Sequence, residues 1–280
     1  MRPTGSVRMS DPALSIERAQ PAAPVTRSGA RLRRRFLTLA AKRALDVLLA
    51  AALLAALVPV LALIALAIKL DSRGPVFFRV RRVGRGGRPF GMLKFRKMHD
   101  GARGGPLTVR SDPRLTRVGA ILARSRLDEL PQLWDVLTGR MSLIGPRPED
   151  PGFVALHPDA YREILSVRPG ITGLSQIAYR EEAAIVDAGR PVDDYVERIM
   201  PQKLTMDRLY ARRVSLTLDL RIAFWTLVTL LLGRPVSVNR VTGSMNIRRR
   251  PAQAAPGPPS AHSAHHDGPA ARNGRARSLC

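Results

Sequence analysis

The hydrophobic pattern of the chain is dominated by one uncharged run, VLLAAALLAALVPVLALIALAI, at residues 47–68. A membrane helix needs about 20 consecutive apolar residues, and a buried helix of a water-soluble protein is seldom apolar on every face over such a length. The run is also longer than the apolar core of a secretory signal, which has about 7 to 15 residues. The pattern therefore predicts a membrane-embedded helix.

Basic residues flank this run on both sides and bear on how the helix sits in a membrane. Positively charged flanks favour the cytoplasmic side, so both ends are expected there. Pro59 lies in the middle, where it removes a backbone donor and bends a helix. Each arm would measure roughly 15 Å, about half of a hydrocarbon core of ~30 Å. The sequence predicts a re-entrant helical hairpin in one leaflet, with a kinked single span as the alternative. The flanking cations are Arg31, Arg33, Arg34, Arg35, Lys42 and Arg43 before the run, and Lys69, Arg73, Arg79, Arg81, Arg82, Arg85 and Arg88 after it.

Two strand-compatible stretches follow between residues 72 and 98, separated by the turn-forming sequence GRGGRP. Glycine and proline at that point favour a short β-hairpin or an extended loop. Arginine and lysine are frequent from residue 73 to residue 103, where Asp100 is the only acid. This charge suits contact with anionic lipid, or a phosphate-binding face centred on KFRKM at residues 94–98. Both interpretations remain open. The apolar side chains of the two stretches are Phe77, Phe78, Val80 and Val83, then Phe90, Met92, Leu93 and Phe95.

An amphipathic helix is predicted over residues 128–138. Leu130, Leu133, Trp134 and Leu137 recur at helical spacing, and Gly139 follows the last of them. Two adjacent acids, Asp128 and Glu129, stand at its start. One of them can cap the helix N-terminus and the other can interact with the helix dipole, so that a purely structural reading and a catalytic reading are both open.

The rest of the chain divides into a domain and two tails. The pattern of residues 194–232 predicts helices. The last apolar stretch, Ile222–Leu232, is too short to span a membrane, so we expect it to pack against the protein or to lie at the membrane interface. Residues 1–35 and 246–280 are rich in Pro, Ala and Arg without apolar periodicity, which predicts disordered tails around a domain at residues 36–245.

Composition narrows the class of partner. The net charge of +24 and the pI near 11.7 indicate an anionic partner, such as nucleic acid, phospholipid or a phosphorylated small molecule. The single cysteine, Cys280, excludes an intramolecular disulfide and a metal site built on several cysteines. A reducing, cytosol-facing environment fits this cysteine content.

Several longer motifs occur in a fixed order behind the apolar helix: SRGPVFF, GRPFxxxKFRxM, DPRLTRVG, LDELPQLWDVLxGxMSLIGPRP and RPGITGLSQI. In this order they resemble the bacterial sugar transferase family, the monotopic polyprenyl-phosphate glycosyl-1-phosphate transferases, in its short form. The resemblance covers roughly Leu39 to Leu232. It implies a mainly α-helical monotopic membrane protein with a small β-hairpin, a re-entrant helical hairpin and interfacial amphipathic helices.

The resemblance also implies a reaction. Members transfer sugar 1-phosphate from a UDP-sugar to undecaprenyl phosphate and release UMP, which begins the assembly of exopolysaccharide, O-antigen or related glycans. By similarity Asp128 is the nucleophile, which forms an aspartyl-phosphosugar intermediate. Glu129 is the second acid of the dyad, for proton handling or for metal and substrate geometry. The family uses Mg²⁺, which would bind through Asp128 and phosphate oxygens.

A carboxylate that attacks a diphosphate needs cations around it. Arg147 is the first candidate ligand of the phosphates, because Pro146 and Pro148 stiffen its loop. The other candidates are Lys94, Arg96, Arg124 and Arg126, for which lipid contact or solvation is the alternative.

The sequence departs from the family pattern in places. Val58 precedes Pro59 where many members have a serine, which removes a side chain able to satisfy freed backbone groups. The segment AYREEAAI, residues 178–185, replaces a commoner motif. It is open whether this segment helps to select the sugar or is structural surface.

The expected partners are a UDP-sugar, undecaprenyl phosphate and anionic membrane lipids, at the cytoplasmic face of a bacterial inner membrane. A nucleic-acid-binding protein would explain the charge, but no nucleic-acid motif occurs, aromatic residues make up only 5%, and the apolar run would have no purpose. A non-catalytic, membrane-anchored basic scaffold explains the run and the charge. It gives no reason for Asp128, Glu129 and Arg147 together.

Overall fold

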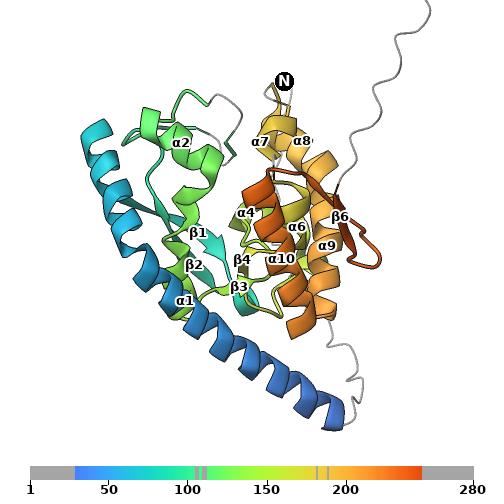
Figure 1. Ribbon diagram of the computed structural model, residues 1–280. Helices are drawn as coiled ribbons and strands as arrows, with labels where there is room; N and C mark the ends of the chain where they lie inside the picture. Colours follow the sequence, from blue (N-terminus) through green and yellow to red (C-terminus); the bar gives the residue numbers. More distant parts are fainter. Residues whose placement is uncertain (1–28, 105–106, 109–111, 181, 188, 248–280) are drawn as a thin grey trace, which may run out of the picture. The chain divides into compact units, whose positions relative to one another are not determined.

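The computed structural model describes residues 29–104, 107–108, 112–180, 182–187 and 189–247 (Figure 1). The remaining parts of the two predicted tails lie outside the described residues. Helix α1 begins at Gly29 and strand β6 ends at Ile247, so regular structure extends past both expected domain limits. Residues 1–45 and 46–280 form two units. The described part of the first is the beginning of α1, and all contacts given below belong to the second.

The chain is mainly helical with three two-stranded sheets among the described residues, which confirms the predicted class (Figure 1). Strands β1 and β2 form the predicted antiparallel hairpin, with Phe77 opposite Phe95 and Val83 opposite Pro89. Strands β3 and β4 pair in parallel, and β5 and β6 pair antiparallel. The strands are β1 (Phe77–Val83), β2 (Pro89–Phe95), β3 (Ser142–Ile144), β4 (Gly170–Thr172), β5 (Val236–Val238) and β6 (Met245–Ile247).

The helices differ widely in length. The long ones are α1 (Gly29–Asp71), α2 (Arg117–Ser125), α9 (Met200–Arg212) and α10 (Leu216–Leu232). The short ones are α3 (Gln132–Leu137), α4 (Pro151–Leu156), α5 (Pro158–Ile164), α6 (Leu174–Ala178), α7 (Glu182–Ile185) and α8 (Pro191–Asp194). Three further turns are η1 (Arg85–Gly87), η2 (Leu127–Glu129) and the π-helical η3 (Tyr195–Ile199).

Helix α1 contains the predicted apolar run and is long and apolar enough to cross a membrane over Phe36–Asp71. It continues through Pro59, so the expected bend does not divide it into two helices. From Asp46 onward, one side of α1 packs against the domain: Ala50 lies in a core with Met92 and Leu133, and Ile68 in a core with Phe95 and Leu122. The opposite side exposes large apolar side chains, namely Leu48, Leu49, Leu53, Val58, Leu63, Leu66 and Leu70. The run is apolar all round because one side meets protein and the other faces outward.

Asp46 is a buried charge within this helix. Its carboxylate accepts hydrogen bonds from the Ser142 hydroxyl at 2.7 Å and from the Leu143 amide at 3.1 Å. These bonds hold α1 on strand β3, and they explain why an acid is retained next to the apolar run.

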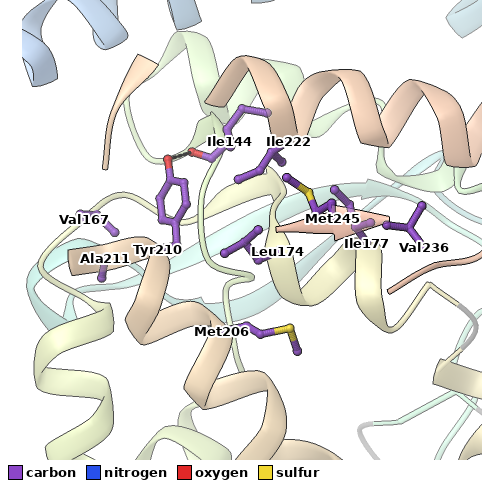
Figure 2. Close-up of a cluster of buried hydrophobic side chains, with 10 residues drawn as sticks. All are labelled: Ile144, Val167, Leu174, Ile177, Met206, Tyr210, Ala211, Ile222, Val236 and Met245. Atoms are coloured by element: carbon purple, nitrogen blue, oxygen red, sulfur yellow. Dashed lines mark hydrogen bonds between the residues drawn. The ribbon is translucent and has the colours of Figure 1, made fainter. Parts of the chain in front are cut away.

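Helix α10 contains the second apolar stretch of the sequence. It buries Ile222 and exposes Leu220, Phe224 and Leu227. Figure 2 shows the core that Ile222 joins, in which the Tyr210 hydroxyl donates to the Ile144 carbonyl at 3.1 Å. The same hydroxyl bonds the Asp219 carboxylate at 2.7 Å. Ile222 thus packs in the protein, while the other side of α10 remains apolar and exposed.

Two glycines allow the chain segments around β3 and β4 to touch. A Cβ on Gly170 would lie 2.1 Å from the Gly145 nitrogen, and a Cβ on Gly145 would lie 2.6 Å from the Arg168 carbonyl oxygen. The Gly170 amide donates to the Pro146 carbonyl at 2.8 Å. The glycines of the GPRP and RPGITG motifs are therefore required by close backbone contact, and this contact fixes the loop that carries Arg147.

Replacing Gly170 by Ala is expected to lower the free energy of unfolding by about 1–3 kcal/mol, because the backbone of Gly145 must move away. Denaturant unfolding of the purified protein measures this change. Gly91→Ala is the matched control, since its Cβ would meet nothing nearer than 3.4 Å. Equal stability of the two variants would show that the strand pair tolerates separation.

Candidate active site

Asp128 and Glu129 lie in the short turn η2, between α2 and α3, and both are buried. Helix α3 begins at Gln132 rather than at residue 128, and no side chain caps it. Side-chain capping of α3 therefore accounts for neither carboxylate. Arg126 directly precedes the turn. Among the described residues it is the one non-glycine residue with a positive φ, which is 63°. Arg126 is the C-cap of α2, and helices commonly end in left-handed backbone, although a non-glycine residue seldom adopts it.

Glu129 is surrounded by cations from three parts of the sequence. Its Oε1 atom accepts from Lys94 Nζ of β2 at 2.8 Å and from Arg147 Nη2 at 2.9 Å. Arg126 Nη1 lies 4.0 Å from the same oxygen. The structure thus brings together Glu129, Lys94, Arg126 and Arg147, four of the residues selected from the sequence.

These contacts change the titration of the groups. Burial alone raises the pKa of the Glu129 carboxyl, but attraction to Arg147 and Lys94 outweighs burial and holds that pKa well below its usual value. Attraction to Glu129 raises the pKa of the Arg147 guanidinium. Burial lowers the pKa of the Lys94 ammonium, and Glu129 offsets only part of this effect. Glu129 is therefore ionised at neutral pH and is a weak base.

Asp128 is more buried than Glu129, with 2% of its surface exposed. Its Oδ2 atom lies 3.6 Å from Lys97 Nζ, a longer contact than either short ion pair of Glu129. Lys97 was not singled out from the sequence, although it belongs to the KFRKM motif. Two adjacent carboxylates are thus held in different ways, Glu129 by short ion pairs and Asp128 by one long contact.

Asp135 of α3 connects the dyad with strand β2. Its Oδ2 atom accepts from the Leu93 amide at 2.8 Å, and Arg140 Nη1 lies 3.2 Å from its Oδ1 atom. Leu93 precedes Lys94, so this fully buried carboxylate holds the lysine-bearing strand beside the turn of Asp128 and Glu129.

Two of the arginines selected from the sequence do not join this cluster. The Arg96 guanidinium is buried and donates to the Ser72 carbonyl at 2.8 Å and to the Arg73 carbonyl, so it supports the loop after α1. A Cβ on Gly74 would collide with it. Arg124 is exposed on α2, outside the ion-pair network of Glu129.

A second buried charge cluster adjoins Arg147. Lys203 Nζ of α9 lies 3.1 Å from Glu149, 3.0 Å from Glu182 and 2.8 Å from the Tyr195 hydroxyl. Its ammonium also lies 4.8 Å from the centre of the Tyr195 ring. Burial alone raises the pKa of Glu149, but Lys203 and Arg82 outweigh it and lower that pKa. Of these residues only Glu182 lay in a segment noted in the sequence, although Glu149 directly follows the GPRP motif.

Glu182 lies within the segment where the sequence departs from the family pattern. Because its carboxylate binds the buried Lys203, it is part of the supporting structure beside Arg147. Nearby, Arg126 Nη2 donates to the Arg180 carbonyl at 2.5 Å. Two residues of this segment, Arg180 and Glu182, therefore contact the charged side chains Arg126 and Lys203 near the dyad.

Asp207 is a buried acid next to the same cluster. It accepts a hydrogen bond from the Ser175 hydroxyl at 2.7 Å. Burial raises the pKa of its carboxyl to about 7, although Ser175 and Lys203 act in the opposite direction. The group is therefore protonated in the folded state below pH 7 and ionised in the unfolded chain above about pH 4.

This difference makes stability depend on pH. Between about pH 4 and pH 7 the folded state binds the proton and the unfolded state does not, so stability falls as pH rises. The loss attributable to Asp207 between pH 5 and pH 8 is expected to be about 2–3 kcal/mol, and Asp207→Asn should remove it. Unfolding of both proteins at the two pH values tests this, and parallel pH profiles would contradict the raised pKa.

Magnesium binding can be tested against the residues present. The described residues contain no group of three or more His, Cys, Asp or Glu side chains that could hold a metal ion. Mg²⁺ commonly binds through one or two carboxylates together with phosphate oxygens and water. Asp128 fits such a site, whereas the Glu129 carboxylate is occupied by Lys94 and Arg147.

The chain is similar to known proteins over most of the described region. A family model for bacterial sugar transferases matches residues 37–233. An undecaprenyl-phosphate glucose phosphotransferase of Komagataeibacter xylinus is 42% identical over 206 residues, which are 69% of this chain and 36% of that protein. A UDP-glucose:undecaprenyl-phosphate glucose-1-phosphate transferase of Caulobacter vibrioides is 41% identical, over 79% of this chain and 78% of that protein.

A third relative has nearly the same length as the matched region. The exopolysaccharide production protein PSS of Rhizobium leguminosarum is 39% identical over 67% of this chain and 94% of its own length. The chain spans only about a third of the K. xylinus relative, but most of the other two. The match of the family model and these identities together show that the chain belongs to the bacterial sugar transferase family.

Proposed function

We propose that the protein transfers a sugar 1-phosphate from a UDP-sugar to undecaprenyl phosphate, releases UMP, and so begins the synthesis of a polysaccharide. The names of the relatives support this reaction class, and two of them specify glucose. The observation that carries the proposal is the pair of buried carboxylates: Asp128 lies 3.6 Å from Lys97, beside a Glu129 held by Lys94 and Arg147.

The dyad suits a two-step displacement at phosphorus. In the first step an Asp128 oxygen attacks the sugar-proximal phosphorus, a bond from that oxygen to phosphorus forms, and the bond to the bridging oxygen of UMP breaks. In the second step a phosphate oxygen of undecaprenyl phosphate attacks the same phosphorus and releases the Asp128 carboxylate. Splitting the transfer in this way replaces one difficult displacement by two easier ones. The lipid-linked sugar diphosphate is the product.

The cations around the dyad have separate roles in this scheme. Lys97 and Arg147 reduce the repulsion between the Asp128 carboxylate and the diphosphate, and Arg147 can bind phosphate oxygens through two N–H groups. Glu129, which stays ionised, positions Lys94 and Arg147 rather than moving a proton. Mg²⁺ bound through Asp128 would neutralise part of the diphosphate charge.

The packing of α1 supports a monotopic arrangement, and the basic residues on both sides of its apolar run favour the cytoplasmic face of the inner membrane. Its inner side meets the domain at Asp46 and again at Ile68, so the helix lies along the domain that it anchors. In this arrangement the exposed leucines of the helix enter one leaflet. The anionic substrate lipid would then meet the dyad at the membrane surface.

Cysteine labelling tests this topology. Cysteines at residues 35 and 75, introduced into a Cys280→Ser protein, are both expected to react from the cytoplasmic side. Labelling from opposite sides would establish a spanning helix instead.

The reaction is tested with purified protein, undecaprenyl phosphate, Mg²⁺ and a panel of UDP-sugars that starts with UDP-glucose. UMP release with one donor, stopped by removal of Mg²⁺, is the expected result. Release of UDP would indicate an ordinary glycosyltransferase. No release with any donor, from a folded protein, would favour the non-catalytic scaffold.

A further inference from the structure

A cavity of about 610 Å³ lies at the tip of the β1–β2 hairpin. Its lining includes four arginines, Arg85, Arg88, Arg140 and Arg168, and no acidic residue. Binding cavities for small ligands commonly have volumes of about 300–1,000 Å³. A cavity of this size and charge can receive a phosphate or diphosphate group.

Two of the arginines are oriented by bonds within the protein. Arg168 Nε donates to the Gly139 carbonyl at 3.0 Å, and Arg140 Nη1 lies 3.2 Å from Asp135. Arg85 and Arg88 are exposed, and no carboxylate of the described residues forms an ion pair with either. An arginine has five N–H donors in a planar fork, which matches the oxygens of a phosphate group.

The turn that carries Arg85 and Arg88 is tied to the protein. The Gly86 amide donates to the Leu165 carbonyl at 2.8 Å, and the Gly84 amide donates to the Arg88 carbonyl at 2.8 Å. Leu165 directly follows α5 and stands three residues before Arg168. The two halves of the arginine cluster are therefore held at a fixed separation, so a ligand does not have to order the turn.

The cavity is separate from the dyad. Strand β2 runs from Pro89 at the cavity to Lys94 at Glu129. At about 3.3 Å per residue this separation is roughly 16 Å. A phosphate held at the cavity therefore cannot also contact Asp128.

The cavity lies next to residues that pack against helix α1. Phe90, which lines it, belongs to the same packed cluster as Leu54 and Leu57 of α1. The adjacent Leu53 and Val58 are exposed on the outer side of that helix. A lipid headgroup beside α1 is thus one source of phosphate for the arginines, and a soluble diphosphate is the other.

We propose that the four-arginine cavity is a second anion-binding site, which takes a phosphate-bearing group independently of the reaction at Asp128. The proposal does not depend on the identity of the sugar or on the transfer reaction. It assigns a binding role to arginines that the proposed mechanism does not use.

Hydrogen exchange of the full-length protein in phosphatidylcholine nanodiscs tests the site locally. One arm adds inorganic pyrophosphate, and the other adds phosphatidylglycerol to the nanodiscs. At a free probe concentration of ten times its Kd, the amides of residues 84–88 are expected to exchange about 10-fold more slowly than without the probe. The double variant Arg85→Gln/Arg88→Gln should lose this protection, while a peptide covering residues 127–134 reports separately on the dyad.

Arg79→Gln/Arg81→Gln is the control, because it removes the same charge from exposed positions of β1 outside the cavity. Protection by pyrophosphate, lost only in the cavity variant, identifies a soluble phosphate as ligand. Protection by phosphatidylglycerol alone, lost in the same variant, identifies a lipid headgroup. Equal exchange at residues 84–88 with and without both probes would overturn the proposal, as would equal loss of protection in the control.

Discussion

Replacing Asp128 by Asn is expected to lower the rate of UMP release by at least about 10⁴-fold, since the side chain loses the carboxylate oxygen that attacks phosphorus. Asparagine has nearly the same volume as aspartate. Among the ion pairs of the described residues, the Asp128 carboxylate forms only the long contact with Lys97. The fold should therefore persist, and circular dichroism and the thermal unfolding midpoint check this. Initial rates with saturating UDP-sugar measure the loss.

Asp159→Asn is the matched control, because Asp159 is 88% exposed in its side chain and lies in a surface ion pair of little energetic value. A second measurement separates the nucleophile from a residue that only positions substrate. Mass spectrometry of acid-quenched wild-type protein should find a phosphosugar on the peptide that contains residue 128, and none on the variant. Near-normal turnover in Asp128→Asn would exclude the covalent mechanism, even if the transfer reaction itself were confirmed.

Replacing Lys203 by Met is expected to destabilise the folded protein by about 3–5 kcal/mol, because Glu149 and Glu182 would be left without their shared buried cation. Native domains are stable by only about 5–15 kcal/mol, so this change removes a large part of the margin. The Tyr195 hydroxyl would also lose its contact with the ammonium. Chemical denaturation in detergent measures the difference.

The pH dependence of this effect has a defined direction. The pKa of Glu149 is lowered in the folded wild type, so its contribution to stability is present above about pH 4.5 and is lost as pH falls through the lowered value. The difference between wild type and Lys203→Met should therefore be largest near neutral pH and shrink in acid. Arg162→Met, which removes an exposed cation, serves as control. A difference that stays constant with pH would mean that packing, not charge, is the main contribution of Lys203.

Local patterns were sufficient for part of the fold. The run at residues 47–68 predicted the long apolar helix, and the GRGGRP sequence between two apolar stretches predicted the β1–β2 hairpin. Both depend on short-range chemistry: an uninterrupted apolar run favours a helix, which here extends beyond the run to Gly29–Asp71, and the hairpin follows from glycines that accept positive φ at Gly86 and Gly87. The strands β3 to β6 were not predicted, because each has only three residues and depends on a partner far along the chain.

The amino-acid sequence by itself determined the class of this protein: a basic, membrane-anchored chain with two adjacent acids and a set of cations selected by motif. Only the tertiary structure decided how these residues are used. It separates Arg96, which binds backbone carbonyls, from Lys94 two residues earlier, which binds Glu129. It adds Lys97 to the dyad and a buried Lys203 beside Arg147. The physical reason is that a side chain's charge follows from its identity, whereas its partners follow from long-range packing, which places residues from β2, η2 and the GPRP loop within hydrogen-bond distance.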